Sequence, residues 1–283
     1  METITNPPFT GIHNFRDVGR VVNSLSRDRL IHENFIYRSG RLDDATPTDR
    51  EKLSRHYGLQ DGTVIDLRTK SEHKKQERIQ ARKTDTGTKT TAPWDVVYIN
   101  FVGRKFQLNV VKQLKWWQII WFMTLMICQF RMAAIRILGR NVLGPRGLLG
   151  LSKDSLRFCQ AEICQALEVF TDFKSYPVLV HCTQGKDRSG LVVMLVLFAL
   201  GIPLELVKAD YALSNEGLAP VRASMIKEVE EMGMDADYTK APPEIVEAVW
   251  NFLLQEYGGI DAYLDGIGFG EEKRRTLRKL LLV

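Results

Sequence analysis

Residues 176–201 constrain the fold more than any other stretch of the chain. Residues 178–180 are a short valine-rich run after a proline, which predicts a buried β-strand. Residues 189–200 are almost uniformly apolar and too long for a typical strand, so they predict a core helix that ends at the following glycine. A tight polar loop that begins with Cys182 and ends with Arg188 joins the two elements.

This arrangement of strand, loop and helix predicts an anion site. A loop that enters a helix N-terminus directs backbone N–H groups and the positive end of the helix dipole into its own concavity. Cys182 in that concavity is favoured as a thiolate, the form that attacks electrophiles. The guanidinium of Arg188 can bind two phosphate oxygens, and Gly185 allows the backbone to turn closely around the ligand. The pattern therefore predicts a phosphate cradle with a nucleophile at its base.

Residues 181–190, His-Cys-Thr-Gln-Gly-Lys-Asp-Arg-Ser-Gly, resemble the signature of the cysteine-dependent protein tyrosine phosphatases. Their Gly-Lys-Asp-Arg core is similar to an atypical bacterial and fungal branch with dual-specificity and lipid-active members. Residues 14–19, 37–40, 64–68 and 210–214 agree with that branch, so the resemblance spans most of the chain. It implies an α/β phosphatase fold with a central, mostly parallel sheet flanked by helices. We expect one domain over residues 1–283, with a helical lid insertion at about residues 101–150.

The resemblance also implies a mechanism and a set of site residues. Cys182 would form a phosphocysteine, Arg188 would bind the phosphoryl oxygens, and no metal or organic cofactor would be needed. The first candidate for the general acid is Asp187, followed by Asp66 and then Asp154. Phosphotyrosine, phosphoserine or threonine and phosphoinositides are the implied substrates. The residues expected to contact the substrate are Thr183, Gln184, Gly185, Lys186, Ser189, Asp66 and Arg16.

Other interpretations of these residues remain open. Cys182 could be an ordinary buried thiol, and a rhodanese-like sulfurtransferase also places a cysteine in an anion-binding loop. A phosphate-binding adaptor without catalytic activity is a further alternative. Arg16 and Asp17 are either a structural ion pair or a border of the active site. The loop does not match a Walker A motif, because Val180 occupies the position of its first glycine.

Composition limits the partners and the compartment. The net charge of +5 suits anionic ligands but is too diffuse to indicate nucleic-acid binding. The four cysteines show no disulfide framework, which favours a reducing, cytoplasmic environment. Residues 1–10 contain no apolar signal core. The histidines are scattered and form no metal-ligand cluster.

The remaining pattern predicts alternating strands and helices. Strands are expected at residues 35–38, 63–67 and 96–100, and a helix at 46–57 with Thr46 as its N-cap. Asp66 would lie near the carboxyl end of its strand, where open α/β sheets bind ligands. Residues 69–91 are charged and rich in threonine and lysine, which predicts a flexible loop without chemistry. Further helices are expected at residues 152–170, 204–213, 221–231, 243–257 and 271–281.

Residues 96–153 contain no acidic residue but nine lysines or arginines, and three tryptophans lie among them at 116, 117 and 121. The most apolar part, residues 116–130, is shorter than the ~20 residues needed to span a bilayer. Two interpretations stand. The segment is either a lid or a core-packing pair of helices, or it contacts an anionic membrane peripherally. Either would place a positive field near an anionic substrate.

Overall fold

The computed structural model describes residues 9–83 and 93–283. Most of the N-terminal segment predicted to lack a signal core, and the second part of the predicted flexible loop, lie outside these residues. A five-stranded sheet in the order β1-β2-β5-β3-β4 forms the centre, and only β1 is antiparallel to its neighbour. The strands are β1 (Arg16–Asp17), β2 (Ile36–Ser39), β3 (Thr63–Asp66), β4 (Asp95–Tyr98) and β5 (Val178–His181). The predicted α/β fold with a mostly parallel sheet is confirmed.

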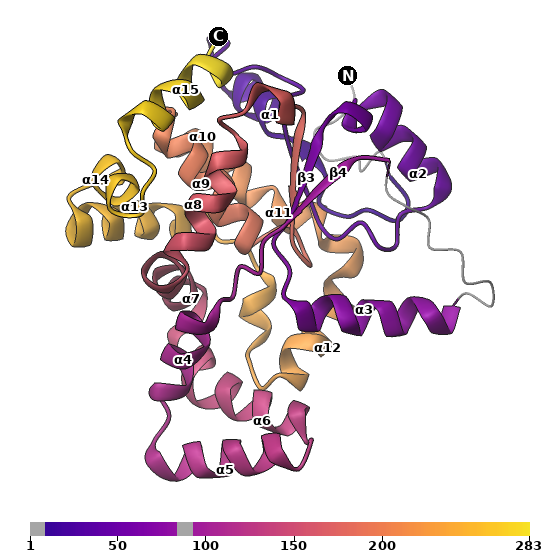
Figure 1. Cartoon of the computed structure of the whole chain (residues 1–283), viewed down its shortest axis with the longest axis vertical. Coiled ribbons are helices and arrows are strands. Elements are labelled where there is room, and N and C mark those ends of the chain that lie inside the picture. Colours follow the sequence, from indigo (N-terminus) through magenta and orange to yellow (C-terminus); the bar gives the residue numbers. More distant parts are fainter. Residues whose placement is uncertain (1–8, 84–92) are drawn as a thin grey trace.

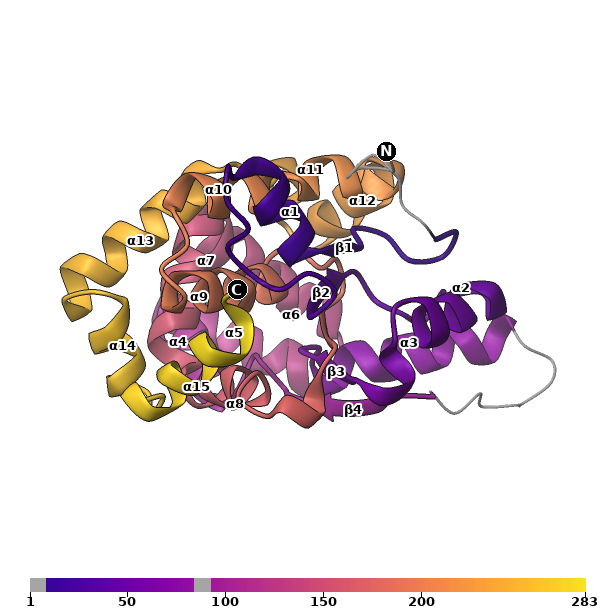
Figure 2. The ribbon, with the colours of Figure 1, turned by 90° about the horizontal axis from the view of Figure 1, so that it is seen from above.

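Helices cover both faces of the sheet (Figures 1 and 2). Alternate residues of the strands point to opposite faces: Val180 packs into the larger core with α9 (Arg188–Ala199), whereas Leu179 packs with the N-terminal segment and the region of α2 (Pro47–Glu51). The larger helices on either side of the sheet and beyond it are α1 (Val18–Leu25), α2 (Pro47–Glu51), α3 (Lys70–Lys83), α4 (Arg104–Lys112), α5 (Trp116–Ile127), α6 (Arg131–Leu138), α7 (Gly144–Phe158), α8 (Gln160–Val169), α9 (Arg188–Ala199), α10 (Leu204–Ala212), α12 (Arg222–Glu231), α13 (Glu244–Tyr257), α14 (Ile260–Gly266) and α15 (Glu271–Leu281).

The central helix is α9. Every residue of this helix after Arg188 is buried, so it is surrounded by other elements on all sides. This explains why its sequence shows an apolar run and no amphipathic period. The helix begins directly after the loop that follows β5, and the predicted strand–loop–helix unit is therefore present.

Two predictions about local structure were wrong. Residues 69–91 were expected to form a loop, but α3 occupies Lys70–Lys83. Residues 152–170 were expected to form one helix, but the chain leaves helical geometry at Cys159, and the helix divides into α7 and α8. The break allows α8 to pack against α9 while α7 packs against α13.

A buried network of charges joins the N-terminal strands to α10. Arg16 Nε donates to Asp210 Oδ1 at 2.7 Å, and Arg38 Nη1 donates to Asp210 Oδ2 at 2.5 Å. All three side chains are almost completely inaccessible to solvent. Asp17 instead caps α1 by accepting the N–H of Arg20. Arg16 therefore pairs with Asp210 and not with Asp17; its predicted contact with substrate stays a prediction.

The same network also supports the loop that follows β5, because its side chains bind the carbonyl oxygens of that loop. Arg38 Nη2 donates to the carbonyl oxygens of Gly185 at 2.9 Å and Lys186 at 3.3 Å. Asn14 Nδ2 donates to the carbonyls of Gln184 and Gly185 at 3.1 and 3.0 Å. The carbonyls of three consecutive loop residues are thus held from the side of β1 and β2, which fixes the orientation of the peptide planes.

Replacing Asp210 tests this support. In Asp210→Asn, two buried guanidinium groups lose their counter-charge, so we expect the free energy of unfolding at neutral pH to fall by about 3 kcal/mol. Denaturant unfolding followed by circular dichroism measures the change. Glu205→Gln is the matched control, because Glu205 is an exposed carboxylate on the same helix and pairs with Lys208 at the surface. That control should change the free energy by less than about 0.5 kcal/mol. Equal unfolding midpoints for Asp210→Asn and wild type would contradict the assignment.

The difference in unfolding free energy between the wild type and Asp210→Asn should depend on pH, and the sign of this dependence follows from the pKa of Asp210. Burial alone would raise the pKa of Asp210, but Arg16 and Arg38 lower it below its ordinary value. A carboxylate with a depressed folded-state pKa stabilises the protein above its unfolded pKa of about 4, and this contribution is lost on acidification. The wild type should therefore lose its advantage over Asp210→Asn as the pH falls below about 4.

Candidate active site

The thiol of Cys182 faces the interior of the loop formed by residues 182–187, named here the Cys182 loop. Its sulfur accepts the backbone N–H of Gly185 at 3.2 Å and lies 3.5 Å from Ser189 Oγ. The residue is 2% exposed. Because α9 begins at Arg188, the sulfur lies before the N-terminus of a helix whose dipole favours negative charge.

Gly185 is required by the backbone of this loop. Its φ of 70° lies in the left-handed region, and a Cβ atom at this position would meet the carbonyl oxygen of Ser39 at 2.2 Å. The loop therefore packs directly against the end of β2, which explains why the Ser39-Gly40 turn accompanies the cysteine motif in the sequence.

Glu72 holds the guanidinium of Arg188. Arg188 Nη1 donates to Glu72 Oε2 at 2.7 Å, and Nη2 donates to Oε1 at 2.6 Å. Thr183 Oγ1 also donates to Glu72, and Arg188 Nη1 reaches the carbonyl of Leu67 at 3.1 Å. The Glu72 carboxylate, with contributions from neighbouring negative groups, raises the pKa of Arg188 against the opposing effect of burial. The arginine is thus fixed beside the loop before any ligand is bound.

Glu72 was not among the predicted site residues, because residues 69–91 were expected to form a loop without chemistry. The sequence did contain a signal for the start of a helix at this point. Thr69 and Glu72 have the spacing of a capping box, in which the backbone N–H of each residue donates to the side chain of the other. Burial would raise the pKa of Glu72, but Arg188 and Thr183 hold it well below its ordinary value. The carboxylate therefore stays ionised.

The ammonium group of Lys186 lies behind the loop. Lys186 was predicted to be a second positive group in the cradle, but the side chain is completely buried. Its Nζ donates to the carbonyls of Tyr238 at 2.6 Å and Lys240 at 2.7 Å, and lies 3.3 Å from Asp187 Oδ1. These contacts anchor the loop to the segment that precedes α13. They do not support the predicted contact with substrate.

Asp66 is held in its ionised form. It pairs with Arg68 at 2.8 Å, and His181 Nε2 lies 3.5 Å away. Burial would raise the pKa of Asp66, but His181 and Arg68 lower it below its ordinary value. An ionised carboxylate in a buried ion pair is a poor proton donor. Asp66 therefore fits a structural role at the carboxyl end of β3 better than the roles of acid or substrate ligand predicted for it.

The other two acid candidates lie in different surroundings. Asp154 is buried on α7, where Arg146 Nη2 donates to it at 2.7 Å. Among the described residues, no hydrogen bond or ion pair joins Asp154 to the Cys182 loop, although burial raises the pKa of Asp154. Asp187 is part of the loop itself, and its side chain is 33% exposed. Of the three carboxylates, Asp187 is the one that shares the loop with the sulfur.

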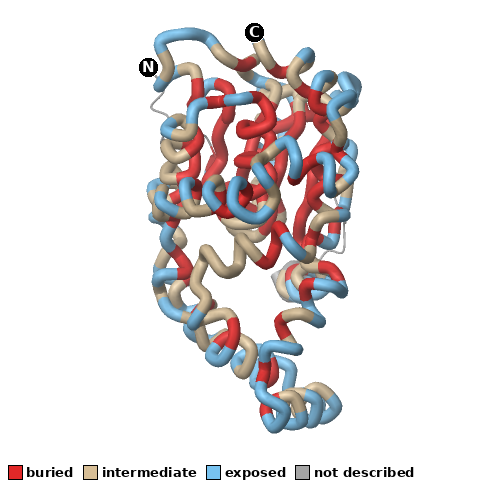
Figure 3. The backbone as a smooth tube through the Cα atoms, turned by 90° about the vertical axis from the view of Figure 1, so that its left-hand side faces the viewer, coloured by how far each residue is buried: buried red, intermediate tan, exposed pale blue. Residues whose placement is uncertain are grey.

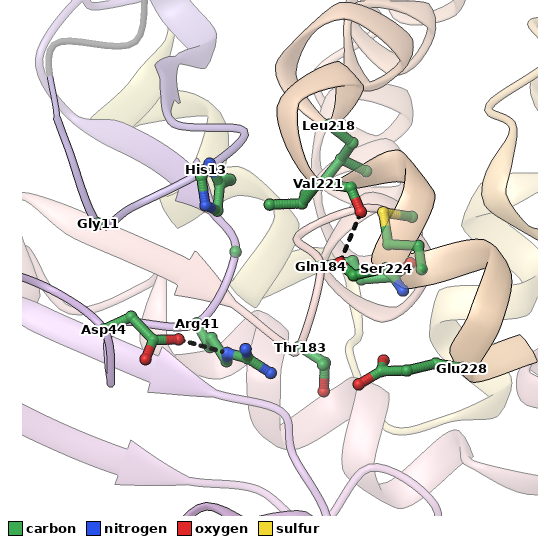
Figure 4. A pocket seen from close by; sticks show the side chains of 12 residues that line it. Gly11, His13, Arg41, Asp44, Thr183, Gln184, Leu218, Val221, Ser224 and Glu228 are labelled. Atoms are coloured by element: carbon green, nitrogen blue, oxygen red, sulfur yellow. Dashed lines mark hydrogen bonds and ion pairs between the residues drawn. The ribbon is translucent and has the colours of Figure 1, made fainter. Parts of the chain in front are cut away.

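A pocket opens beside the outer surface of the Cys182 loop (Figure 4). Thr183 and Gln184 form one wall, and α12 contributes Glu228 to another. His13 and Arg41 approach from the opposite side, where Arg41 pairs with Asp44. The predicted residues Thr183 and Gln184 therefore border open space that a bound group can enter.

Comparison with known proteins agrees with the motif. The model of the tyrosine phosphatase family matches residues 7–283. The triple specificity protein phosphatase PtpB of Mycobacterium tuberculosis is 33% identical over 122 residues, which cover 38% of this chain and 44% of that protein. A tyrosine-protein phosphatase of Nostoc commune is 29% identical over 110 residues, covering 36% of this chain and 37% of the relative.

A putative tyrosine-protein phosphatase of Cupriavidus necator is 30% identical over 98 residues, covering 31% of this chain and 33% of the relative. The matched part of the chain thus spans less than half the length of these curated relatives. The family model, in contrast, extends from the N-terminal segment to the last residue. The resemblance found in the sequence is confirmed, and the chain belongs to the tyrosine phosphatase family.

Proposed function

We propose that this chain hydrolyses phosphate monoesters through a phosphocysteine intermediate. The observation that carries the proposal is the position of the Cys182 sulfur. It accepts a hydrogen bond from the Gly185 N–H and lies in the loop that leads into the N-terminus of α9. Glu72 already orients the guanidinium of Arg188 next to Thr183 of the same loop. Family membership and the similarity to named phosphatases support the same reaction.

In the first step, the sulfur of Cys182 attacks phosphorus, an S–P bond forms and the ester P–O bond breaks. The loop N–H groups and Arg188 stabilise the charge on the equatorial oxygens. Asp187 gives its proton to the departing oxygen. In the second step, water attacks phosphorus, the S–P bond breaks and Asp187 takes a proton from the water. Ser189 Oγ, at 3.5 Å, is placed to donate to the departing sulfur.

The substrate classes that we propose are phosphotyrosine, phosphoserine or phosphothreonine, and phosphoinositides. The mycobacterial relative is named a triple specificity protein phosphatase, which supports a broad range of substrates. We further propose a reducing compartment such as the cytoplasm, because a thiol-dependent mechanism requires reduced Cys182. All four cysteines of the chain are free, which agrees with this proposal.

A panel of phosphopeptides and phosphoinositides tests the reaction. We expect the purified chain to release inorganic phosphate from at least one class, and Cys182→Ser to release none, because a serine hydroxyl is a far weaker nucleophile. Phosphate binding without turnover would overturn the proposal in favour of an adaptor. Turnover of thiosulfate without phosphate release would instead indicate a sulfurtransferase.

Asp187→Asn tests the proton donor. An alkyl leaving group needs a proton, whereas a nitrophenolate leaves readily without one, so the loss should be about 100-fold for alkyl phosphates and much smaller for nitrophenyl phosphate. Steady-state kinetics with both esters measures the difference. Asp154→Asn is the matched comparison and should affect both esters equally. If Asp154→Asn instead lost activity selectively on alkyl phosphates, the general acid would be Asp154 on α7.

Glu72→Gln tests the orientation of the arginine. The variant keeps the shape of the side chain but loses the charge that binds both Nη groups, so we expect kcat/KM to fall about 10- to 100-fold. The control is Glu77→Gln, since Glu77 lies exposed on the same helix. Unchanged kcat/KM in Glu72→Gln would show that Arg188 does not depend on this carboxylate.

A further inference from the structure

Helices α5 and α6 form a hairpin that stands away from the sheet, at the bottom of Figure 1. In Figure 3 most of the α5 end of this hairpin is exposed. The exposed surface is apolar, although apolar side chains of this size are usually covered. The exposed large apolar residues of this hairpin, named here the apolar tip, are Trp116, Trp117, Ile120, Trp121, Met123, Ile127, Phe130, Met132 and Ile135.

The root of the hairpin is fixed, so the exposure of the apolar tip is built into the fold. Gln118 Nε2 donates to Asn141 Oδ1 at 2.8 Å, and Arg136 Nε donates to the carbonyl of Glu231 at 3.1 Å. Gly139 approaches the end of α12 so closely that a Cβ atom would lie 1.8 Å from the carbonyl oxygen of Met232. These contacts hold one side of the hairpin and leave the tryptophan side uncovered.

The rim of the apolar tip carries positive charge. Residues 96–153 include no acidic side chain, and Lys112, Lys115 and Arg131 are all exposed around the hairpin. In the described part of the chain, none of these three side chains forms an ion pair with a carboxylate. A surface with exposed tryptophans, aliphatic side chains and unneutralised cations matches the interface of an anionic bilayer.

We propose that the apolar tip docks on the surface of an anionic lipid bilayer, with α5 lying in the interface. Among the described residues, no helix has both the length and the apolar content needed to cross a membrane. A symmetric contact between two copies would bring the positive rims together, where like charges repel. A bilayer containing anionic lipids supplies both the apolar layer and the opposite charge.

The docking end of the molecule is also the end at which the Cys182 loop lies. In a parallel sheet the carboxyl ends of β3, β4 and β5 share one edge. From that edge the chain leaves β4 through α4 to α5, downward in Figure 1. A phosphorylated headgroup at a bilayer surface would thus lie on the side of the molecule that carries the loop. Docking does not depend on the proposed catalytic reaction.

Vesicle binding of the whole chain tests the proposal without any turnover. The probes are vesicles of phosphatidylcholine alone and vesicles with about 30 mol% phosphatidylserine, in a sedimentation assay. We expect binding to the anionic vesicles and at least about 10-fold weaker binding to the neutral ones. Because no phosphate ester is cleaved, failure of this experiment would not affect the proposed phosphatase reaction.

Two sets of variants separate the apolar and the charge contributions. The triple variant Trp116→Ser, Trp117→Ser, Trp121→Ser should bind anionic vesicles at least about 10-fold more weakly. Its control is Phe173→Ser, which replaces an exposed aromatic residue just before the amino end of β5.

The charge contribution is tested with the triple variant Lys112→Gln, Lys115→Gln, Arg131→Gln. Its affinity for anionic vesicles should fall roughly 5-fold for each charge removed. The control for charge is Arg27→Gln, Arg275→Gln, Lys279→Gln, three exposed sites away from the hairpin. Thermal unfolding confirms that each variant is folded.

A fluorophore at Cys128 reports the contact directly. Cys128 is the exposed thiol at the C-terminal end of α5, and the other three cysteines are buried. In a Cys182→Ser background, an environment-sensitive label at Cys128 should shift to the blue with anionic vesicles and remain unchanged with neutral ones. This experiment reads the local environment and needs no activity.

Three results would overturn the proposal. The first is that the wild-type chain does not bind anionic vesicles, or that the triple tryptophan variant binds them as well as the wild type does. The second is a stable dimer that the tryptophan variant dissociates, without vesicle binding, which would assign the apolar tip to a second copy. The third is a shift of the Cys128 label caused by tungstate in the absence of vesicles, without a vesicle-dependent shift. That result would identify the hairpin as a lid over the site.

Discussion

The carbonyl oxygens of Gln184, Gly185 and Lys186 are held from behind by Asn14 and Arg38. A peptide plane whose carbonyl is fixed on one side presents its N–H on the other, so these contacts set the direction of the loop N–H groups. Gly185 N–H and the Cys182 sulfur are brought together in this way. An anion that enters the loop then meets donors that need no rearrangement.

Two carboxylates orient the arginines around the Cys182 loop. Asp210 neutralises Arg16 and Arg38, which support the loop, whereas Glu72 orients Arg188, which contacts Thr183 of the loop. Removing charges of this kind from water is costly, and apolar side chains of the same volume would often stabilise a fold equally well. The charges are explained by the geometry that they impose on the loop. In the same way, Lys186 uses its ammonium to bind two carbonyls of the segment before α13.

The sequence was most informative where one local pattern determines the structure. The valine run, the cysteine loop and the apolar helix follow one another along the chain, so β5 and α9 could be predicted closely. The contact between Glu72 and Arg188 joins residues 116 positions apart, and neither side chain indicates the other. The surroundings of Lys186 could not be predicted for a related reason: its position in the motif suggests the cradle, but its Nζ binds carbonyls more than 50 residues later. The kink at Cys159 is equally non-local, since α7 and α8 face different helices.

Mass spectrometry of the enzyme trapped during turnover tests the central claim most directly. Acid quenching with a rapidly cleaved aryl phosphate should yield protein heavier by about 80 Da, with the added mass on the peptide that contains Cys182. The added mass should be absent from Cys182→Ser treated in the same way. Rapid turnover with no added mass on this peptide, or with the phosphoryl group on another residue, would contradict an account in which this sulfur, in its nest of backbone N–H groups, is the nucleophile.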